Sequence, residues 1–322
     1  MASGKNLSNI VNIAEFNRVH NTIRKELSLT LHSTPISNVA LRIDYMSTTL
    51  SIEEVERLGY YDFMGYLGVP FFNIGGHTSI NRIAEMCHIG AGTKVLEIGC
   101  GTGGNACYLA EKYGCSVIGI DIAEHMIKQA TKKAEERSLS DRVSFRVGNA
   151  YNLELPDDAF DAVITIFVSQ FLDPAKAFPG FHRVLKSGGY LGVNEMYRAE
   201  NVPQEATTLV DACVKTFCEL TELPFTLRTP ATWSRSFESA GFANISLEEH
   251  PNENESPYSE GVIEEFGGWG KFASTIWRVI VYGLRSGKIR KRYASLGSAK
   301  KTLLRDKETS KYIGYILGTG TK

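Results

Sequence analysis

The sequence of 322 residues predicts an α/β fold, in which a doubly wound, mostly parallel sheet of seven strands carries a mainly helical cap. Short apolar runs alternate with amphipathic segments of helical period, the pattern of a parallel sheet covered by helices on both faces. A glycine-rich turn joins the first apolar run, at 94–99, to the first of these helices, at 104–113. Strand–turn–helix units of this kind are typical of Rossmann-like sheets.

The remaining elements follow in a regular order. Pro179 interrupts one expected helix, because proline lacks the N–H that a helix interior requires. A helix that ends at Gly241 and a strand after it precede the last segment of the chain, which has the alternation of one more strand. The expected elements are strand 116–122, helix 124–138, strand 143–150, a strand within 155–168, helix 175–186, strand 188–196, helix 232–242, strand 243–250 and the closing strand 311–322.

Three segments lie outside the expected sheet, at 1–78, 198–228 and 251–310. The predicted organisation is an N-terminal helical cap segment at 1–78, a core at 79–250, a basic helical cap insertion at 251–310 and a final core strand at 311–322. Ligands of open α/β sheets bind beyond the carboxyl ends of the strands. A cap at that edge would enclose a substrate.

Bulk properties favour a soluble, cytosolic protein. No apolar run reaches the length of a membrane span, and the polar N-terminus has no signal-peptide core. The six cysteines form no C-x-x-C pair, and no histidine completes a metal set, so we expect reduced thiols and no metal site.

Charge is uneven, although the net charge is only −1. Between Lys271 and Lys322 there are 13 basic and 2 acidic residues. Lys271, Arg278 and Arg285 are seven residues apart and share one face of an expected helix whose other positions are largely apolar. The segment 271–311 could therefore touch an anionic membrane surface, line a pocket for a greasy or anionic molecule, or form a lid with a solvated face. RNA is less favoured, since no recognition module is visible.

The glycine-rich turn fits two ligands. Gly99, Gly101 and Gly104 form the dinucleotide pattern G-x-G-x-x-G, and Gly103 in place of Gly104 gives G-x-G-x-G. Either pattern lets the backbone approach a ligand at a helix N-terminus. Asp121, at the end of the second strand, can accept both hydroxyls of a ribose.

Glu97 bears on the choice between the two ligands. It lies two residues before the first glycine, on the first strand. A buried carboxylate there would repel a pyrophosphate, but it could orient the cationic end of an amino acid. This favours S-adenosylmethionine (SAM) over a nicotinamide cofactor.

Four ordered motifs then carry a family resemblance. The run VLEIGCGTGGNACYLA … VIGIDIAEHMIKQA … VSFRVGNAYNLELPDDAFDAVI … FHRVLKSGGYLGVNE resembles the class I SAM-dependent methyltransferases. It is most similar to the small-molecule group that includes quinone-biosynthesis and phosphobase N-methyltransferases. The resemblance covers about 79–250 and the final strand.

The resemblance implies a binding role for each matching residue. The turn would hold the methionine end of SAM, Asp121 would take the ribose hydroxyls, and Ile122 would pack on adenine. Asn149 stands where the family usually has Asp, and it keeps an acceptor oxygen for the adenine amino group. The implied set is Glu97, Gly99, Cys100, Gly101, Gly103, Asp121, Ile122, Asn149, Ala150, Tyr151, Phe167 and Val168.

The predicted activity is methyl transfer to a small, partly apolar metabolite such as a quinone-like ring, a lipid precursor or an amine. A base is needed only if the acceptor arrives protonated. Tyr66 and His77, close to the core in sequence, and Glu195, placed at the end of the fifth strand, are the candidates. Tyr60 and Tyr61 lie in the same aromatic segment as Tyr66 and are favoured less by position. Two alternatives stay open, an NAD(P)-dependent oxidoreductase and a non-catalytic membrane- or partner-binding module with a SAM fold. The sequence does not indicate an oligomeric state.

Overall fold

The computed structural model describes residues 50–70, 75–252 and 265–322, and the chain divides into two compact units. One unit combines the part up to residue 58 with 281–298, and the other combines 59–280 with 299–322. Each unit is described by itself below. Expectations for 1–49, 71–74 and 253–264 lie outside the described residues.

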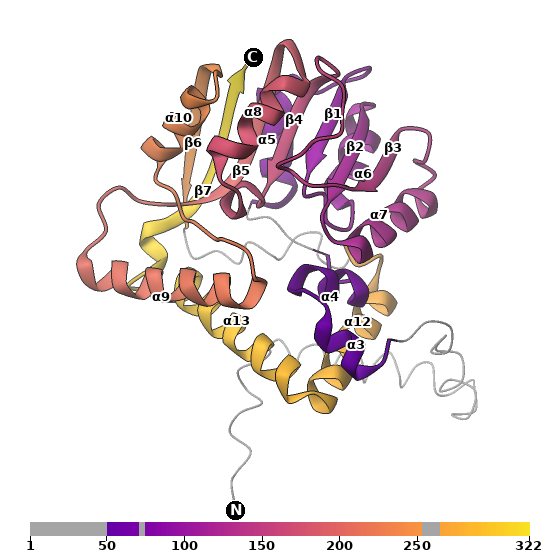
Figure 1. The fold of residues 1–322 in the computed structure, drawn as a ribbon, viewed down its shortest axis with the longest axis vertical. Coiled ribbons are helices and arrows are strands. Elements are labelled where there is room, and N and C mark those ends of the chain that lie inside the picture. Colours follow the sequence, from indigo (N-terminus) through magenta and orange to yellow (C-terminus); the bar gives the residue numbers. More distant parts are fainter. Residues whose placement is uncertain (1–49, 71–74, 253–264) are drawn as a thin grey trace, which may run out of the picture. The chain divides into compact units, whose positions relative to one another are not determined.

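The larger unit contains a seven-stranded sheet in the order β3-β2-β1-β4-β5-β7-β6 (Figure 1). The first five strands pair in parallel, and β7 runs antiparallel to both of its neighbours, β5 and β6. The predicted mostly parallel, seven-stranded, Rossmann-like sheet is confirmed. The strands are β1 (Lys94–Ile98), β2 (Ser116–Asp121), β3 (Val143–Val147), β4 (Phe160–Ile166), β5 (Leu185–Arg198), β6 (Ala243–Pro251) and β7 (Ile313–Thr321).

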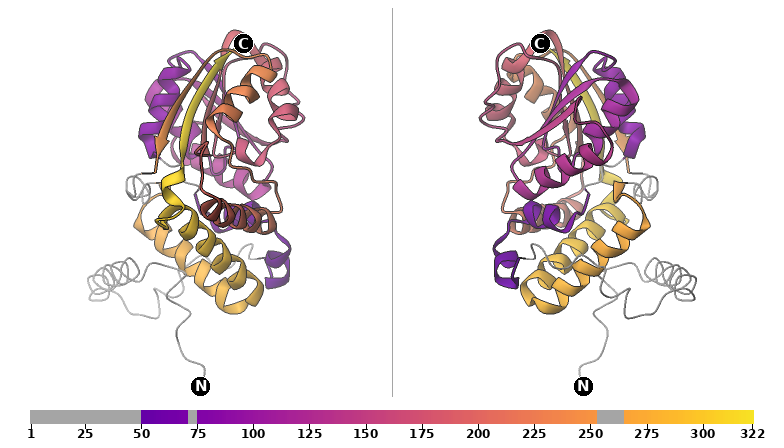
Figure 2. Two further views of the ribbon diagram at one scale, coloured as in Figure 1. Left: turned by 90° about the vertical axis from the view of Figure 1, so that its left-hand side faces the viewer. Right: turned by 90° about the vertical axis from the view of Figure 1, so that its right-hand side faces the viewer.

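Helices cover both faces of this sheet (Figure 2). α5 (Gly76–Met86), α6 (Gly104–Tyr113) and α7 (Glu124–Glu136) pack on one face through small and branched side chains. α8 (Pro174–Val184) and α10 (Pro230–Ser239) cover the other face with a largely aromatic core. Because both faces are buried, the central strands are largely apolar, as the sequence pattern predicts.

Further helices of the larger unit lie beyond the carboxyl ends of the parallel strands. α4 (Tyr60–Leu67) and α9 (Gln204–Thr221) are on that side in Figure 1, opposite the end of β7 that carries the C-terminus. The short 3-10 helix η1 (Ser169–Phe171) follows β4 at the same edge. This is the edge where the sequence places the ligand.

α3 (Ile52–Arg57) lies among the described residues of the smaller unit, and a capping box holds its N-terminus. Ser51 Oγ accepts a hydrogen bond from the Glu54 N–H at 3.2 Å, and Glu54 Oε2 accepts one from the Ser51 N–H at 2.7 Å. In the same unit, Lys288 Nζ donates to the carbonyl oxygen of Glu56 at 3.1 Å. Two longer helices contribute residues to both units, α12 (Trp269–Arg285) and α13 (Gly287–Arg305).

Two local predictions are wrong. Pro179 does not interrupt its helix, because α8 continues from Pro174 to Val184 around it. Only the hydrogen bond to the Ala175 carbonyl is lost, in the second turn, and burial of the aromatic face holds the helix together. Glu195 does not end its strand, since β5 continues to Arg198 alongside the full length of β7.

Among residues 50–70, 75–252 and 265–322, no helix combines the length and apolar character needed to cross a bilayer.

Candidate SAM-binding site

The turn after β1 is built on three glycines with left-handed backbone. Gly99, Gly101 and Gly103 have φ of 70°, 51° and 74°, values that favour glycine. A Cβ at Gly99 would collide with Val168, whereas a Cβ at Gly101 would meet no atom of the described residues within 4 Å. Gly101 therefore has an open side, as expected of backbone that approaches a ligand. Cys100 is buried under the turn, and its N–H donates to the carbonyl of Ile120 at 3.0 Å.

Asp121, at the end of β2, secures this turn. Its Oδ2 accepts a hydrogen bond from the Gly101 N–H and its Oδ1 accepts one from the Ala123 N–H, both at 2.9 Å. Each carboxylate oxygen has a second lone pair, so each can still accept a hydrogen bond from a ligand hydroxyl. Asp121 is therefore placed to hold the glycine turn and a ribose together.

Glu97 is a buried carboxyl group that is only partly hydrogen-bonded. Its side chain is 1% exposed on β1, and Oε1 accepts from Asn105 Nδ2 at 3.3 Å. No hydrogen-bond partner reaches Oε2 within the part of the chain that the structure describes. Burial raises the pKa of Glu97 to about 8, against the lowering effects of the Asn105 hydrogen bond and of the nearby Ala106 N–H. Such a group is suited to a buried cation, which would supply the missing partner.

Exposed apolar side chains surround the expected adenine position. Ile122 is 63% exposed and Tyr151 is 44% exposed, both high for large apolar groups. Asn149 Oδ1 accepts from the Tyr151 N–H at 2.9 Å, so part of its acceptor capacity stabilises its own loop. Ala150 packs on the core behind this loop. The loops after β2 and β3 thus present flat apolar surface beside Asp121.

Phe167 and Val168 follow β4 directly. Glu195 accepts hydrogen bonds from backbone N–H groups of the turn that contains them. Phe167 has φ of 58°, an uncommon backbone conformation for a bulky residue. Glu195 is fully buried, and Oε1 accepts from Thr165 Oγ1, the Val168 N–H and the Ser169 N–H at 2.8–3.0 Å. Burial raises the pKa of Glu195 to about 7.

Arg228 holds the same turn from its carbonyl side. Its guanidinium donates to the carbonyl oxygens of Ser169 at 3.0 Å and Leu172 at 2.6 Å, and it stacks over Trp233. Burial lowers the pKa of Arg228. Sequence reasoning missed this residue, because it lies in an irregular segment outside the four motifs.

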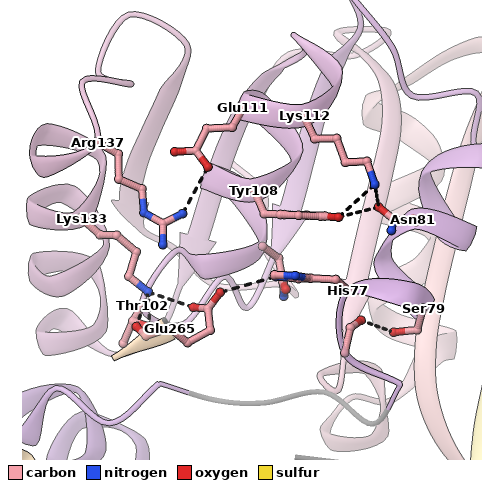
Figure 3. Close-up of polar contacts among 12 residues, drawn as sticks. His77, Ser79, Asn81, Thr102, Tyr108, Glu111, Lys112, Lys133, Arg137 and Glu265 are labelled. Atoms are coloured by element: carbon pink, nitrogen blue, oxygen red, sulfur yellow. Dashed lines mark hydrogen bonds and ion pairs between the residues drawn. The ribbon is translucent and has the colours of Figure 1, made fainter. Parts of the chain in front are cut away.

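The three candidate bases occupy separate environments. Tyr66 is buried, with the Arg278 guanidinium 4.9 Å above its ring. His77 lies in the first turn of α5, where its ring stacks on Tyr108 at 3.9 Å (Figure 3). Glu195, as described above, directs its carboxylate at backbone N–H groups. The structure does not gather them into one cluster.

A tyrosine favoured less than Tyr66 lies nearer the charged groups of the site. The ring of Tyr61 packs edge-on against Phe171 at 5.6 Å. Burial raises the pKa of Tyr61 well above its usual value, and the charges of Asp121 and Glu195 raise it further. The neighbouring residue Tyr60 looks equivalent in sequence, so only the packing of α4 distinguishes them.

Aromatic contacts extend from Tyr61 to α9. Phe171 packs against Phe225 at 5.2 Å, and Phe225 stacks on Phe217 of α9 at 4.9 Å. This aromatic row, Tyr61–Phe171–Phe225–Phe217, adjoins the turn after β4. Within the described residues, no group of three or more His, Cys, Asp or Glu is arranged to hold a metal ion.

Comparisons with known proteins agree with this geometry. Residues 96–193 match the family model described as a methyltransferase domain. Phosphoethanolamine N-methyltransferase 1 of Triticum aestivum is 28% identical over 187 residues, which cover 58% of this chain and 35% of that relative. Sterol 24-C-methyltransferase erg6 of Aspergillus fumigatus is 35% identical over 130 residues, 40% of this chain and 34% of that relative. The chain thus matches about a third of the length of these two relatives.

A solved structure shares the fold. Phosphoethanolamine N-methyltransferase 2 of Haemonchus contortus, in complex with phosphomonomethylethanolamine and S-adenosylhomocysteine (SAH), aligns with a TM-score of 0.59 and 19% identity. The alignment covers 85% of this chain and 60% of that one. The predicted resemblance is confirmed: residues 96–193 match a methyltransferase domain, the two relatives are methyltransferases, and the chain has the Rossmann-like fold of the solved structure.

Proposed function

We propose that this chain transfers the methyl group of SAM to a small, partly apolar metabolite. The observation that carries the proposal is Glu97, whose buried Oε2 has no hydrogen-bond partner among the described residues and lies beside the glycine turn. The ammonium group of SAM is a cation of the right kind for this oxygen. A pyrophosphate would instead meet an uncompensated carboxyl group.

The other site residues would hold the remaining parts of the cofactor. Gly101 and Gly103 present backbone to the methionine end, and the N-terminus of α6 offers its free N–H groups to the carboxylate. Asp121 accepts hydrogen bonds from the ribose hydroxyls, and Ile122 and Tyr151 cover the adenine ring. Asn149 accepts a hydrogen bond from the adenine amino group. Phe167 and Val168 line the methionine portion.

SAM supplies an electrophilic methyl group, whose bond to sulfur breaks as a bond to the acceptor forms. The protein must align the acceptor with that bond and exclude water, and such alignment can contribute about 7–11 kcal/mol. The turn after β4 suits this task, because Glu195 and Arg228 fix its N–H and carbonyl groups. We therefore assign Glu195 a positioning role.

The aromatic row favours an acceptor with an apolar body. Tyr61 is within reach of Tyr60, Asp121 and Glu195, and the two carboxyl groups are negative when ionised. A quinone-like ring, a lipid precursor or an amine fits this surface better than an anion does. A phenol with a raised pKa stays protonated, so Tyr61 would orient the acceptor by donating a hydrogen bond.

A peripheral contact with anionic membrane through 271–311 remains part of the proposal. α12 exposes Trp269 and Trp277, at 56% and 60%. Two of its basic residues are already engaged, Lys271 with Glu136 and Arg278 with backbone carbonyls. The contact would therefore depend on the tryptophans and on α13, and sedimentation with phosphatidylserine vesicles tests it. Binding that is unchanged when both tryptophans are replaced by serine would contradict it.

The activity is tested with SAM labelled on its methyl group. The full chain is incubated with labelled SAM and a cell extract, and organic-soluble, aqueous and macromolecular fractions are counted. We expect label in the organic fraction, and none with Glu97→Gln at the same SAM concentration. Label in the aqueous fraction alone would overturn the apolar acceptor, and absence of protein-dependent label would contradict methyl transfer.

A further inference from the structure

A charged cluster outside the four motifs touches the glycine-rich turn. Glu265, four residues before α12, pairs through Oε2 with Lys133 Nζ of α7 at 3.2 Å. Its Oε1 lies 3.8 Å from His77 Nε2 of α5. Lys133 Nζ also donates to Thr102 Oγ1 at 3.4 Å, so the cluster reaches the centre of the turn (Figure 3).

Gly104 provides the space that this carboxylate occupies. A Cβ on Gly104, the first residue of α6, would lie 2.3 Å from Glu265 Oε2. The glycine that completes the dinucleotide pattern therefore has a different task in this chain. It admits an acidic side chain from 161 positions further along the sequence.

The Lys133–Glu265 pair at the centre of the cluster is largely shielded from water, whereas His77 is partly exposed. The side chains of Lys133 and Glu265 are 15% and 17% exposed. Burial acts to raise the pKa of Glu265, but the His77 contact and the Lys133 charge outweigh it and lower the pKa to about 2. Glu265 is thus ionised at neutral pH, and its charge adds to the raised pKa of Glu97. An ion pair this well shielded couples its residues more strongly than an exposed pair does.

We propose that Glu265 is a positioning residue for the cofactor turn, which it holds through Lys133 and Thr102 and braces against Gly104. His77 acts as the second support of Glu265, with its ring fixed on Tyr108. This inference rests on the proposed SAM site. It removes His77 from the candidate bases and makes SAM affinity depend on a residue outside every motif.

The charge balance of the cluster makes the proposal specific. Lys133 neutralises Glu265 beside Glu97 and beside the end of α6 that would receive the SAM carboxylate. Without Lys133, an unpaired carboxylate would remain there and repel the ligand. Removing the lysine should therefore cost more affinity than removing the acid, and removing both should cost less than removing the lysine alone.

Calorimetric titration of SAH into the full chain tests this order. We expect Glu265→Gln to weaken binding about fivefold and Lys133→Met about twentyfold, with the double variant closer to Glu265→Gln. Lys133→Arg keeps the charge and should bind within about twofold of wild type. A scaffold role without charge coupling would not produce this order or this rescue.

The matched control is Glu136→Gln. It removes the exposed Lys271–Glu136 pair, which also joins α7 to α12 at 2.7 Å, and should leave SAH affinity within about twofold. Thermal unfolding of each variant checks that it is folded, and Glu265→Gln is close in shape to the native side chain. Wild-type affinity in both Glu265→Gln and Lys133→Met would overturn the inference and leave the proposed function intact. Failure of the wild type to bind SAH would overturn both.

Discussion

Glu97 on β1 and Glu195 on β5 are two buried carboxyl groups near the same edge of the sheet, and their partners differ. Both are almost fully buried, and burial raises the pKa of both, to about 8 and about 7. Glu195 accepts hydrogen bonds from four donors, one hydroxyl and three backbone N–H groups. Glu97 accepts one from Asn105 Nδ2, and its Oε2 has no hydrogen-bond partner in the part of the chain that the structure describes.

Under the proposed function, this difference separates a structural acid, Glu195, from an acid that binds the cofactor, Glu97. A buried polar group whose partners all come from the fold is part of the fold. One that lacks a partner carries a cost that a ligand can remove. Burial and a raised pKa alone would have made both residues candidates for catalysis, whereas their hydrogen-bond partners assign them opposite roles.

The largest effect is expected from Glu195→Ala. It leaves four donors without their acceptor in a buried turn, so the free energy of unfolding should fall by about 4 kcal/mol. Urea unfolding measures this, with the exposed Glu219→Ala on α9 as control, expected within about 0.5 kcal/mol of wild type. Unchanged stability together with lost activity would return Glu195 to the catalytic candidates.

Glu97→Gln should affect binding rather than folding. Its protonated form resembles glutamine, so stability should not fall, while SAH affinity should fall about 100-fold because the ammonium loses its charged acceptor. Calorimetric titration and thermal unfolding of the same sample separate the two effects. Unaltered affinity would refute the assignment of Glu97 to the cofactor.

The pH dependence of binding follows from the raised pKa of Glu97. Below about pH 8 this group is protonated in the free protein, and a bound ammonium favours its ionised form. One proton is therefore released on binding, and the affinity for SAH should increase by up to about tenfold per pH unit between pH 6 and 7.5. Titrations in buffers of different ionisation enthalpy measure that proton. If Glu97→Gln still releases a proton on binding SAH, that proton comes from another group.

Asp121→Asn should give a smaller effect, because Asp121 combines both roles. It supports Gly101 and Ala123 and keeps lone pairs for a ligand. Asparagine retains one acceptor oxygen but turns an amide N–H toward a backbone N–H, so we expect about fivefold weaker SAH binding and about 1 kcal/mol less stability. A loss of stability without loss of affinity would remove the ribose assignment.

Local pattern was sufficient to predict the sheet and the glycine turn after β1. Strands buried on both faces leave continuous apolar runs, and a turn that needs left-handed backbone leaves glycines at fixed spacing. The final strand, β7, was also predicted from its alternation, at 311–322 against the observed Ile313–Thr321. These signals lie within a few residues of the structures they specify.

Features that depend on tertiary contacts were missed. Glu265 and Arg228 meet the site from segments far along the chain, and no spacing rule connects them to it. Tyr61 was ranked behind Tyr66 because position along a helix says nothing of which face packs on η1. Pro179 was expected to break α8, but burial of neighbouring aromatic side chains outweighs one missing hydrogen bond.

A crystal structure of the full chain with SAH tests the central claim most directly. The account predicts that the ammonium nitrogen lies about 3 Å from Glu97 Oε2, with the carboxylate at the N-terminus of α6 and the ribose on Asp121. It also predicts that the four hydrogen bonds of Glu195 are unchanged. An ammonium group placed away from Glu97, or a ligand contact made by Glu195 in its place, would contradict it.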